Sequence, residues 1–242
     1  MNTAECHSRA RACLSGRYGE AFIVTAVCIF VFVTFRAAIM LSVNAIGDET
    51  FSWFAEGVLT ALCFIIITPL LTGGVWWFYQ TVSGGDNRSL LKLYSGFRLN
   101  RRAALLYIFM WLKGFISLFP TAVCWTAAYI LIHGEYDISA EIAVFASFQL
   151  MVLGVVLITF FISRMLGTLL APFIFIKRPD MNPFRVMRQS ARLMKGHRLA
   201  FAKLTFKYVM LMLPLVTVPF VMPSAVMTAA VFANERLEDG QI

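Results

Sequence analysis

The chain has 242 residues, of which 60% are hydrophobic and only 14% are charged, and its formal net charge is +8. A soluble domain typically carries about 25% charged residues, so this composition argues against a soluble protein. Five or six membrane spans of about 20 residues would use about half the chain and leave no room for a separate soluble domain. The sequence therefore predicts a single transmembrane domain over residues 1–242.

Six apolar runs follow one another along the chain. Helices are expected for all of them, because a backbone in lipid must satisfy its own hydrogen bonds and the alternating pattern of barrel strands is absent. The predicted fold class is an all-α, polytopic integral membrane bundle of about six transmembrane helices with cytoplasmic amphipathic helices. The predicted spans are residues 21–45, 57–79, 103–132, 142–165, 199–217 and 219–235.

The two ends of this series differ in how well the sequence defines them. The first apolar run begins at Ala21 and has no small-residue cleavage site after a short core, so it is expected to remain as an uncleaved span. Pro214, Pro219 and Pro223 divide the last run, which predicts either a full hairpin or a re-entrant one.

Charge predicts the orientation. None of the 21 Lys and Arg residues falls in the acidic segments 47–57 and 133–141, whereas residues 88–102 and 177–198 are strongly basic. Basic connections remain cytoplasmic. We therefore expect a multi-pass cell-membrane protein with a cytoplasmic N-terminus, and a cytoplasmic C-terminus if the final hairpin crosses fully. Because the positive charge flanks the spans, no nucleic-acid partner is expected.

The clearest amphipathic element follows Asp180. Asn182 is suited to cap a helix and Pro183 to occupy its first turn. Basic residues then recur at helical spacing, with an apolar series one position earlier. The candidate contact residues are Arg185, Arg188, Arg192, Lys195 and Arg198, and the apolar series is Phe184, Met187, Ala191 and Met194, widened by Val186 and Leu193.

Such a helix is expected to lie on the inner leaflet, where each basic residue contributes about 1 kcal/mol of attraction to anionic headgroups. It either anchors the loop to membrane lipids or docks a cytoplasmic protein partner or specific headgroup. A second, shorter interfacial helix is predicted near residues 90–97, and Gly16, Gly96 and Gly196 are predicted hinges between such helices and the spans that follow.

The predicted spans 21–45 and 103–132 each contain one cation, Arg36 and Lys113, and neither contains an Asp or Glu. Intramembrane charges are functional candidates, but both side chains are long enough to reach toward an interface. Pro69 and Pro120 interrupt the spans 57–79 and 103–132, which either breaks these helices or kinks them for packing. The alternatives are snorkelling cations and a polar pathway of a small transporter or channel subunit.

No enzymatic pattern is present. His7, His133 and His197 lie in three separate regions, and the five cysteines have no metal-binding spacing. We expect no catalytic residues, no metal and no cofactor, and a non-enzymatic membrane component that acts by helix packing, lipid contact or partner binding.

The segment Ser190-Ala191-Arg192-Leu193-Met194-Lys195-Gly196-His197-Arg198 resembles the motif of a bacterial multi-pass family, domain of unknown function 975. Its core is Lys195-Gly196-His197. Residues 14–19 and 69–73 are similar to two further family elements, and Pro223, Thr228, Ala230 and Phe232 to its closing element. This chain departs from the pattern at Ala191, Leu211, Ser224 and Ala233.

This resemblance implies a six-span plasma-membrane protein typical of Gram-positive bacteria. The family's activity is uncharacterised, so the resemblance implies a topology and no mechanism.

Overall fold

The structure is a computed structural model that describes residues 3–44, 49–84, 100–133, 139–214 and 217–239. Within these ranges the regular elements are α-helices, and no strand occurs. The all-helical fold class is therefore confirmed. The second interfacial helix predicted near residues 90–97 lies outside the described residues, as does the predicted hinge Gly96.

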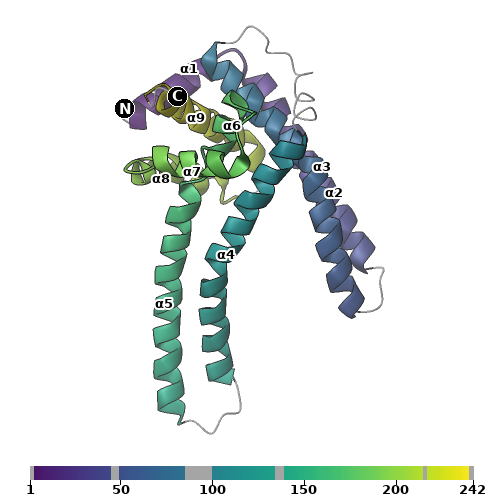
Figure 1. The fold of residues 1–242 in the computed structure, drawn as a ribbon, viewed down its shortest axis with the longest axis vertical. Helices are drawn as coiled ribbons and strands as arrows, with labels where there is room; N and C mark the ends of the chain where they lie inside the picture. The colour runs from purple at the N-terminus through teal and green to yellow at the C-terminus, as the bar shows by residue number, and fades with distance from the viewer. Residues whose placement is uncertain (1–2, 45–48, 85–99, 134–138, 215–216, 240–242) are drawn as a thin grey trace.

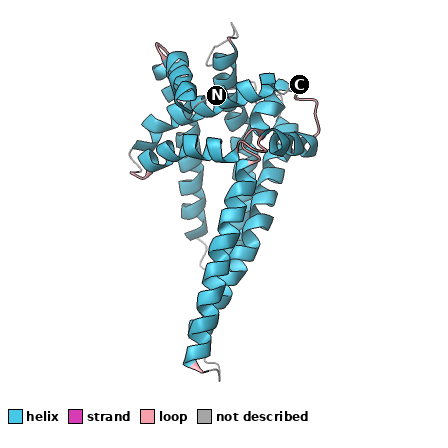
Figure 2. Cartoon of the chain, turned by 90° about the vertical axis from the view of Figure 1, so that its left-hand side faces the viewer, coloured by secondary structure: helices cyan, strands magenta, loops and turns pink. Residues whose placement is uncertain are grey.

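Two long helical hairpins dominate the molecule. The first joins α2 (Tyr18–Asn44) to α3 (Glu49–Ser83), and the second joins α4 (Asn100–His133) to α5 (Ala140–Leu166). Both extend in the same general direction from a group of shorter helices, and their far ends splay apart (Figure 1). The view from the side shows the second hairpin as the longest projection of the molecule (Figure 2).

The remaining helices gather where the two hairpins meet (Figure 1), and we call this group the platform. It comprises α1 (Thr3–Leu14), α6 (Ala171–Lys177), α7 (Pro183–Leu193), α8 (Arg198–Met212) and α9 (Val218–Asp239). The main hydrophobic core lies here, with Trp77, Phe175, Met194 and Met227 all almost fully buried. Both described ends of the chain lie close together in the platform (Figure 1).

The hairpins, in contrast, expose their apolar side chains. Phe115 on α4 is 69% exposed and Phe145 on α5 is 65% exposed. In water this surface would be unfavourable by about 25 cal/mol for each Å² of apolar area, so lipid is its natural solvent. Four stretches are long and apolar enough to cross a membrane among the described residues: Tyr18–Val43, Arg101–His133, Glu141–Lys177 and Val218–Glu238.

The predicted count of about six spans is not confirmed. The predicted span 57–79 lies within α3, which pairs with α2. It is not among the four stretches, and several α3 side chains lie outside the described residues. The predicted span 199–217 corresponds to α8, which has 15 residues. At 1.5 Å per residue α8 is about 22 Å long, short of the roughly 30 Å of a hydrocarbon core.

Residues 219–235 form part of α9, one helix that continues through Pro223. This helix is long enough to cross a membrane, yet it packs within the platform, where Met227, Ala230 and Ala233 are fully buried. The apolar residues of 199–235 therefore divide between two uses: those of α9 near Met227 build a protein core, whereas Phe206 and Val209 on α8 are exposed. Composition cannot distinguish these two uses of an apolar side chain, and this is why the span count was uncertain.

Prolines do not break the long helices. Both α3 and α4 continue through Pro69 and Pro120. Near Pro69, α3 packs on α2, and a Cβ atom on Gly74 would lie in ordinary van der Waals contact with Cys28 Sγ, at 3.5 Å. Of the two alternatives for Pro69 and Pro120, broken helices are therefore not observed at these prolines.

Candidate functional site

The platform carries a cationic surface on α7. Its cap is as predicted, because Asn182 Oδ1 accepts a hydrogen bond from Phe184 N at 3.1 Å, with Pro183 in the first turn. Four basic side chains are exposed on one side of this region, and we call them the α7 stripe. They are Arg185, Arg188, Arg192 and Lys195.

The opposite side of α7 packs into the protein. Val186, Ser190 and Met194 are fully buried in the platform, whereas Phe184, predicted on the apolar face, is 60% exposed. Most of the apolar face predicted for this helix therefore packs on protein, with Phe184 as an exposed exception. The helix already has a protein surface to cover, which its own sequence could not show.

The α7 stripe has no carboxylate partner in the described parts of the chain. The described ion pairs of the platform lie elsewhere: Arg102 pairs with Asp180 at 3.2 Å, and Arg9 pairs with Glu235 at 3.0 Å. Arg188 lies over the ring of Phe184, 5.8 Å from its centroid, which leaves its charge uncompensated. This surface is suited to an anionic partner.

A second group of cations lies where the α4–α5 hairpin joins the platform. The Nη1 atom of Arg198 donates to Ser163 Oγ at 3.2 Å, and Ser163 adjoins Arg164 in the last turn of α5. Arg164 and Arg198 act electrostatically on Lys113, which projects from α4. We call Lys113, Arg164 and Arg198 the hairpin cluster.

The depth of Lys113 follows from its neighbour. Gly114 is buried, and a Cβ atom there would lie 3.4 Å from Met165 Sδ, so Lys113 is level with the end of α5. The first part of α4 packs on the platform, with Ala103 and Leu106 fully buried. The remaining 114–133 would span about 30 Å, the thickness of the hydrocarbon core. Lys113 therefore lies at the edge of the lipid-length segment.

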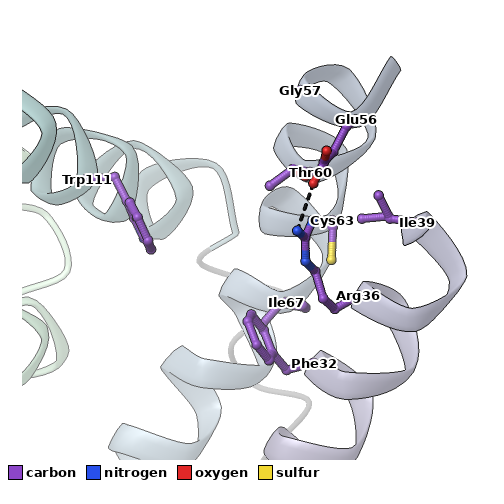
Figure 3. Close-up of a pocket in the computed structure, with 9 residues that line it drawn as sticks. All are labelled: Phe32, Arg36, Ile39, Glu56, Gly57, Thr60, Cys63, Ile67 and Trp111. Carbon is purple, nitrogen blue, oxygen red and sulfur yellow. Dashed lines mark hydrogen bonds and ion pairs between the residues drawn. The ribbon is translucent and has the colours of Figure 1, made fainter. Parts of the chain in front are cut away.

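Arg36 has different surroundings, on the α2–α3 hairpin (Figure 3). Its Nη2 atom lies 2.7 Å from Glu56 Oε1, at one wall of a cavity of about 520 Å³ that also includes Cys63 and Trp111. Glu56 lies one residue before the predicted span 57–79 but within the continuous α3, so the sequence did not predict it as the partner of Arg36.

The structure does not bring Arg36 and Lys113 together, since the cavity beside Arg36 is not lined by Lys113. Sequence reasoning missed Glu56, Ser163 and Arg164. Glu56 could have been found by extending the span one residue toward the N-terminus. Arg164 lies at the end of the predicted span 142–165, and its relation to Lys113 depends on the pairing of α4 with α5.

A third polar group joins three platform helices. His7 Nδ1 on α1 lies 3.1 Å from Tyr208 Oη on α8, which lies 2.9 Å from Thr228 Oγ1 on α9. Partial burial, followed by the positive charges of Lys207 and Arg11, lowers the pKa of His7 below its ordinary value. A neutral His7 therefore favours the assembled platform. Among the described residues no group of three His, Cys, Asp or Glu side chains could hold a metal ion.

Comparison with known proteins agrees with the motif resemblance. The sequence model of the family described as protein of unknown function (DUF975) matches residues 1–232. The chain belongs to this family. No curated protein and no solved structure matches it.

Several DUF975 motif residues in this chain connect helices of the platform to one another. Ser190 is fully buried and donates to Gly167 O at 2.8 Å, which ties α7 to the turn after α5. Gly196, with φ of 85°, turns the chain from α7 into α8, and Gly16, with φ of 78°, turns α1 into α2. Both glycines confirm the predicted hinges, because other residues rarely adopt this conformation.

The closing element has a similar role. Thr228 and Ala230 are fully buried and Phe232 is 4% exposed, and all three pack in the core of the platform. The residues that carry the family resemblance thus include several that hold the platform together.

Proposed function

We propose that this protein is a non-enzymatic, multi-pass plasma-membrane component whose platform lies on the cytoplasmic face and contacts anionic lipid headgroups. The observation that carries the proposal is the α7 stripe, four exposed cations with no carboxylate partner in the described chain, at the end of apolar hairpins. At about 1 kcal/mol each, four such residues supply about 4 kcal/mol of attraction, or roughly a thousandfold in local affinity.

Charge asymmetry supports the orientation. The platform carries the basic residues of 177–198, whereas the acidic segments 47–57 and 133–141 include residues that connect the helices at the far ends of the hairpins. Basic segments near membrane spans resist export. Both termini, which lie together in the platform (Figure 1), would therefore be cytoplasmic.

The alternative of a transporter or channel subunit has less support. It requires a polar route that joins Arg36 to Lys113, whereas Arg36 pairs with Glu56 and Lys113 lies near Arg164 and Arg198. A protein partner on the α7 stripe is the alternative that the following experiment separates from lipid contact.

The test uses the full chain in nanodiscs of neutral or partly anionic lipid. A fluorophore is attached at Phe184→Cys, an exposed position beside the stripe, in a background in which the native cysteines are replaced by Ala. A quencher on the lipid headgroups reports contact. We expect stronger quenching in anionic discs, and its loss at high salt, because exposed charges are screened.

The control replaces Arg185, Arg188, Arg192 and Lys195 with Gln. This variant should insert and fold normally, since all four side chains are exposed, but show equal quenching in both kinds of disc. Quenching that is independent of lipid charge in the unaltered stripe would exclude the headgroup role and favour a protein partner.

A further inference from the structure

We propose that the hairpin cluster is a discrete binding site for the phosphate of one anionic membrane phospholipid, held by Lys113, Arg164 and Arg198. The proposal deepens the lipid contact proposed above and rests on the α4–α5 hairpin crossing the membrane. It differs from that contact in kind, because the α7 stripe presents an open charged surface, whereas the cluster draws its cations from three helices.

The cations of this cluster lack a counter-ion. No carboxylate pairs with any of the three in the described part of the chain. Arg198 is half-buried, and its Nε atom is buried with no hydrogen-bond partner while Nη1 is held by Ser163. Like charges repel one another, and near a membrane their repulsion is weakly screened. An anion with several acceptor oxygens would relieve the repulsion by accepting charge-assisted hydrogen bonds from these cations.

The surroundings favour a lipid phosphate over a free one. Arg164 lies over the ring of Phe160, 5.1 Å from its centroid, and Phe160 is 59% exposed one turn further into the hairpin. On α4, Ile116 is 61% exposed and lies one turn beyond Lys113 in the same direction. A phospholipid whose phosphate contacts the cations would place its acyl chains along these apolar side chains.

The surroundings of the Arg198 guanidinium hold it beside the turn that follows α5. Gly167 follows α5 beside the cluster, and a Cβ atom there would lie 3.5 Å from Arg198 Nη2. At this ordinary van der Waals distance, the Arg198 guanidinium lies against the turn that follows α5. The hydrogen bond to Ser163 fixes the position of this guanidinium.

The test is native mass spectrometry of the full chain in detergent, titrated with phosphatidylglycerol, phosphatidylcholine or inorganic phosphate. The principal variant is Lys113→Gln with Arg164→Gln, which leaves Arg198 and its bond to Ser163 in place. The matched control is Lys203→Gln with Lys207→Gln, which removes the same charge from two exposed positions on α8. Arg164→Gln alone, an exposed single change on α5, serves if the double variant fails to fold.

We expect the unaltered chain to bind one phosphatidylglycerol at least about tenfold more tightly than phosphatidylcholine, and the cluster variant to lose that preference. The control should remain within about twofold of the unaltered chain. Equal binding of the two lipids, or an undiminished preference in the cluster variant, overturns the proposal. Inorganic phosphate that binds as well as phosphatidylglycerol overturns the assignment to a lipid.

The variant of the α7 stripe separates the two proposals. If it keeps the tightly bound phosphatidylglycerol while losing charge-dependent quenching, both sites exist independently. If the stripe responds to lipid charge but the cluster variant still binds phosphatidylglycerol, only the cluster proposal fails.

Discussion

Gly154 offers the sharpest test of the packing between α4 and α5. A Cβ atom at this position would overlap the indole of Trp125, a contact that real Cβ atoms do not make. Gly57, a helical glycine on α3, has no heavy atom within 4 Å of the corresponding position. Gly154→Ala and Gly57→Ala are therefore the same chemical change in a tight site and in an open one.

The two substitutions should change the free energy of unfolding differently. Alanine in a helix is favoured over glycine by about 1 kcal/mol, so Gly57→Ala should stabilise the protein by up to that amount. At Gly154 the same gain is opposed by overpacking, which costs about 1–3 kcal/mol. The free energy of unfolding of Gly154→Ala should therefore lie about 1–3 kcal/mol below that of Gly57→Ala.

Titration with sodium dodecyl sulfate in mixed micelles, followed by helical circular dichroism, measures this difference. Trp125→Ala removes the indole, so in that background Gly154→Ala should no longer be penalised. Equal stabilities for the two alanine variants would show that α4 and α5 do not approach as described. A penalty that persists without the indole would show that its cause is not Trp125.

Three further results follow from the structure. Ser190→Ala should lower the free energy of unfolding by about 1–3 kcal/mol, because it leaves the buried Gly167 carbonyl without its hydrogen-bond donor. The control Ser42→Ala, at an exposed site, should change it by less than about 0.5 kcal/mol. Similar losses in the two variants would show that the Ser190 hydrogen bond does not stabilise the contact between α7 and the turn after α5. The free energy of unfolding should fall as pH decreases from 6.5 toward the lowered pKa of His7, because the unfolded chain binds the proton first. His7→Gln should reduce this dependence of the free energy of unfolding on pH. An unchanged pH dependence in that variant would exclude His7 as its source. A double-mutant cycle of Arg36→Gln and Glu56→Gln should give a coupling energy of about 0.5–3 kcal/mol, and additive effects would mean that the pair is not formed.

Much of the fold could be predicted from local features of the sequence. The helical character of the chain, the Asn182 cap and the hinges at Gly16 and Gly196 depend on neighbouring residues alone. These features were confirmed because lipid requires helices and because a left-handed turn favours glycine.

The fate of the apolar residues could not be predicted in the same way. Met194 and Met227 bury their side chains against other helices, whereas Phe115 and Phe145 expose theirs, although all four are apolar residues in helical runs. The difference depends on which helices meet, and that is a property of the whole chain. For the same reason α8 is apolar yet too short to span, and most of the apolar face of α7 packs on protein.

The candidate sites show the same division. The α7 stripe was predictable because its members share one short helix. The hairpin cluster was not, because Lys113, Arg164 and Arg198 are far apart in the chain and meet only when α4 pairs with α5 beside the start of α8. The Arg36–Glu56 pair was missed because the carboxylate fell just outside a predicted boundary, and the boundaries of elements are the least certain part of such predictions.

Cysteine accessibility in intact cells tests most directly whether the hairpins cross the membrane below a cytoplasmic platform. In a background with the native cysteines replaced by Ala, Ser139→Cys places a thiol just before α5 at the far end of the second hairpin, and Arg188→Cys places one on the platform. An impermeant maleimide should label position 139 in intact cells and position 188 only after the cells are opened. Labelling of position 188 from outside, or labelling of both positions alike, would contradict the account.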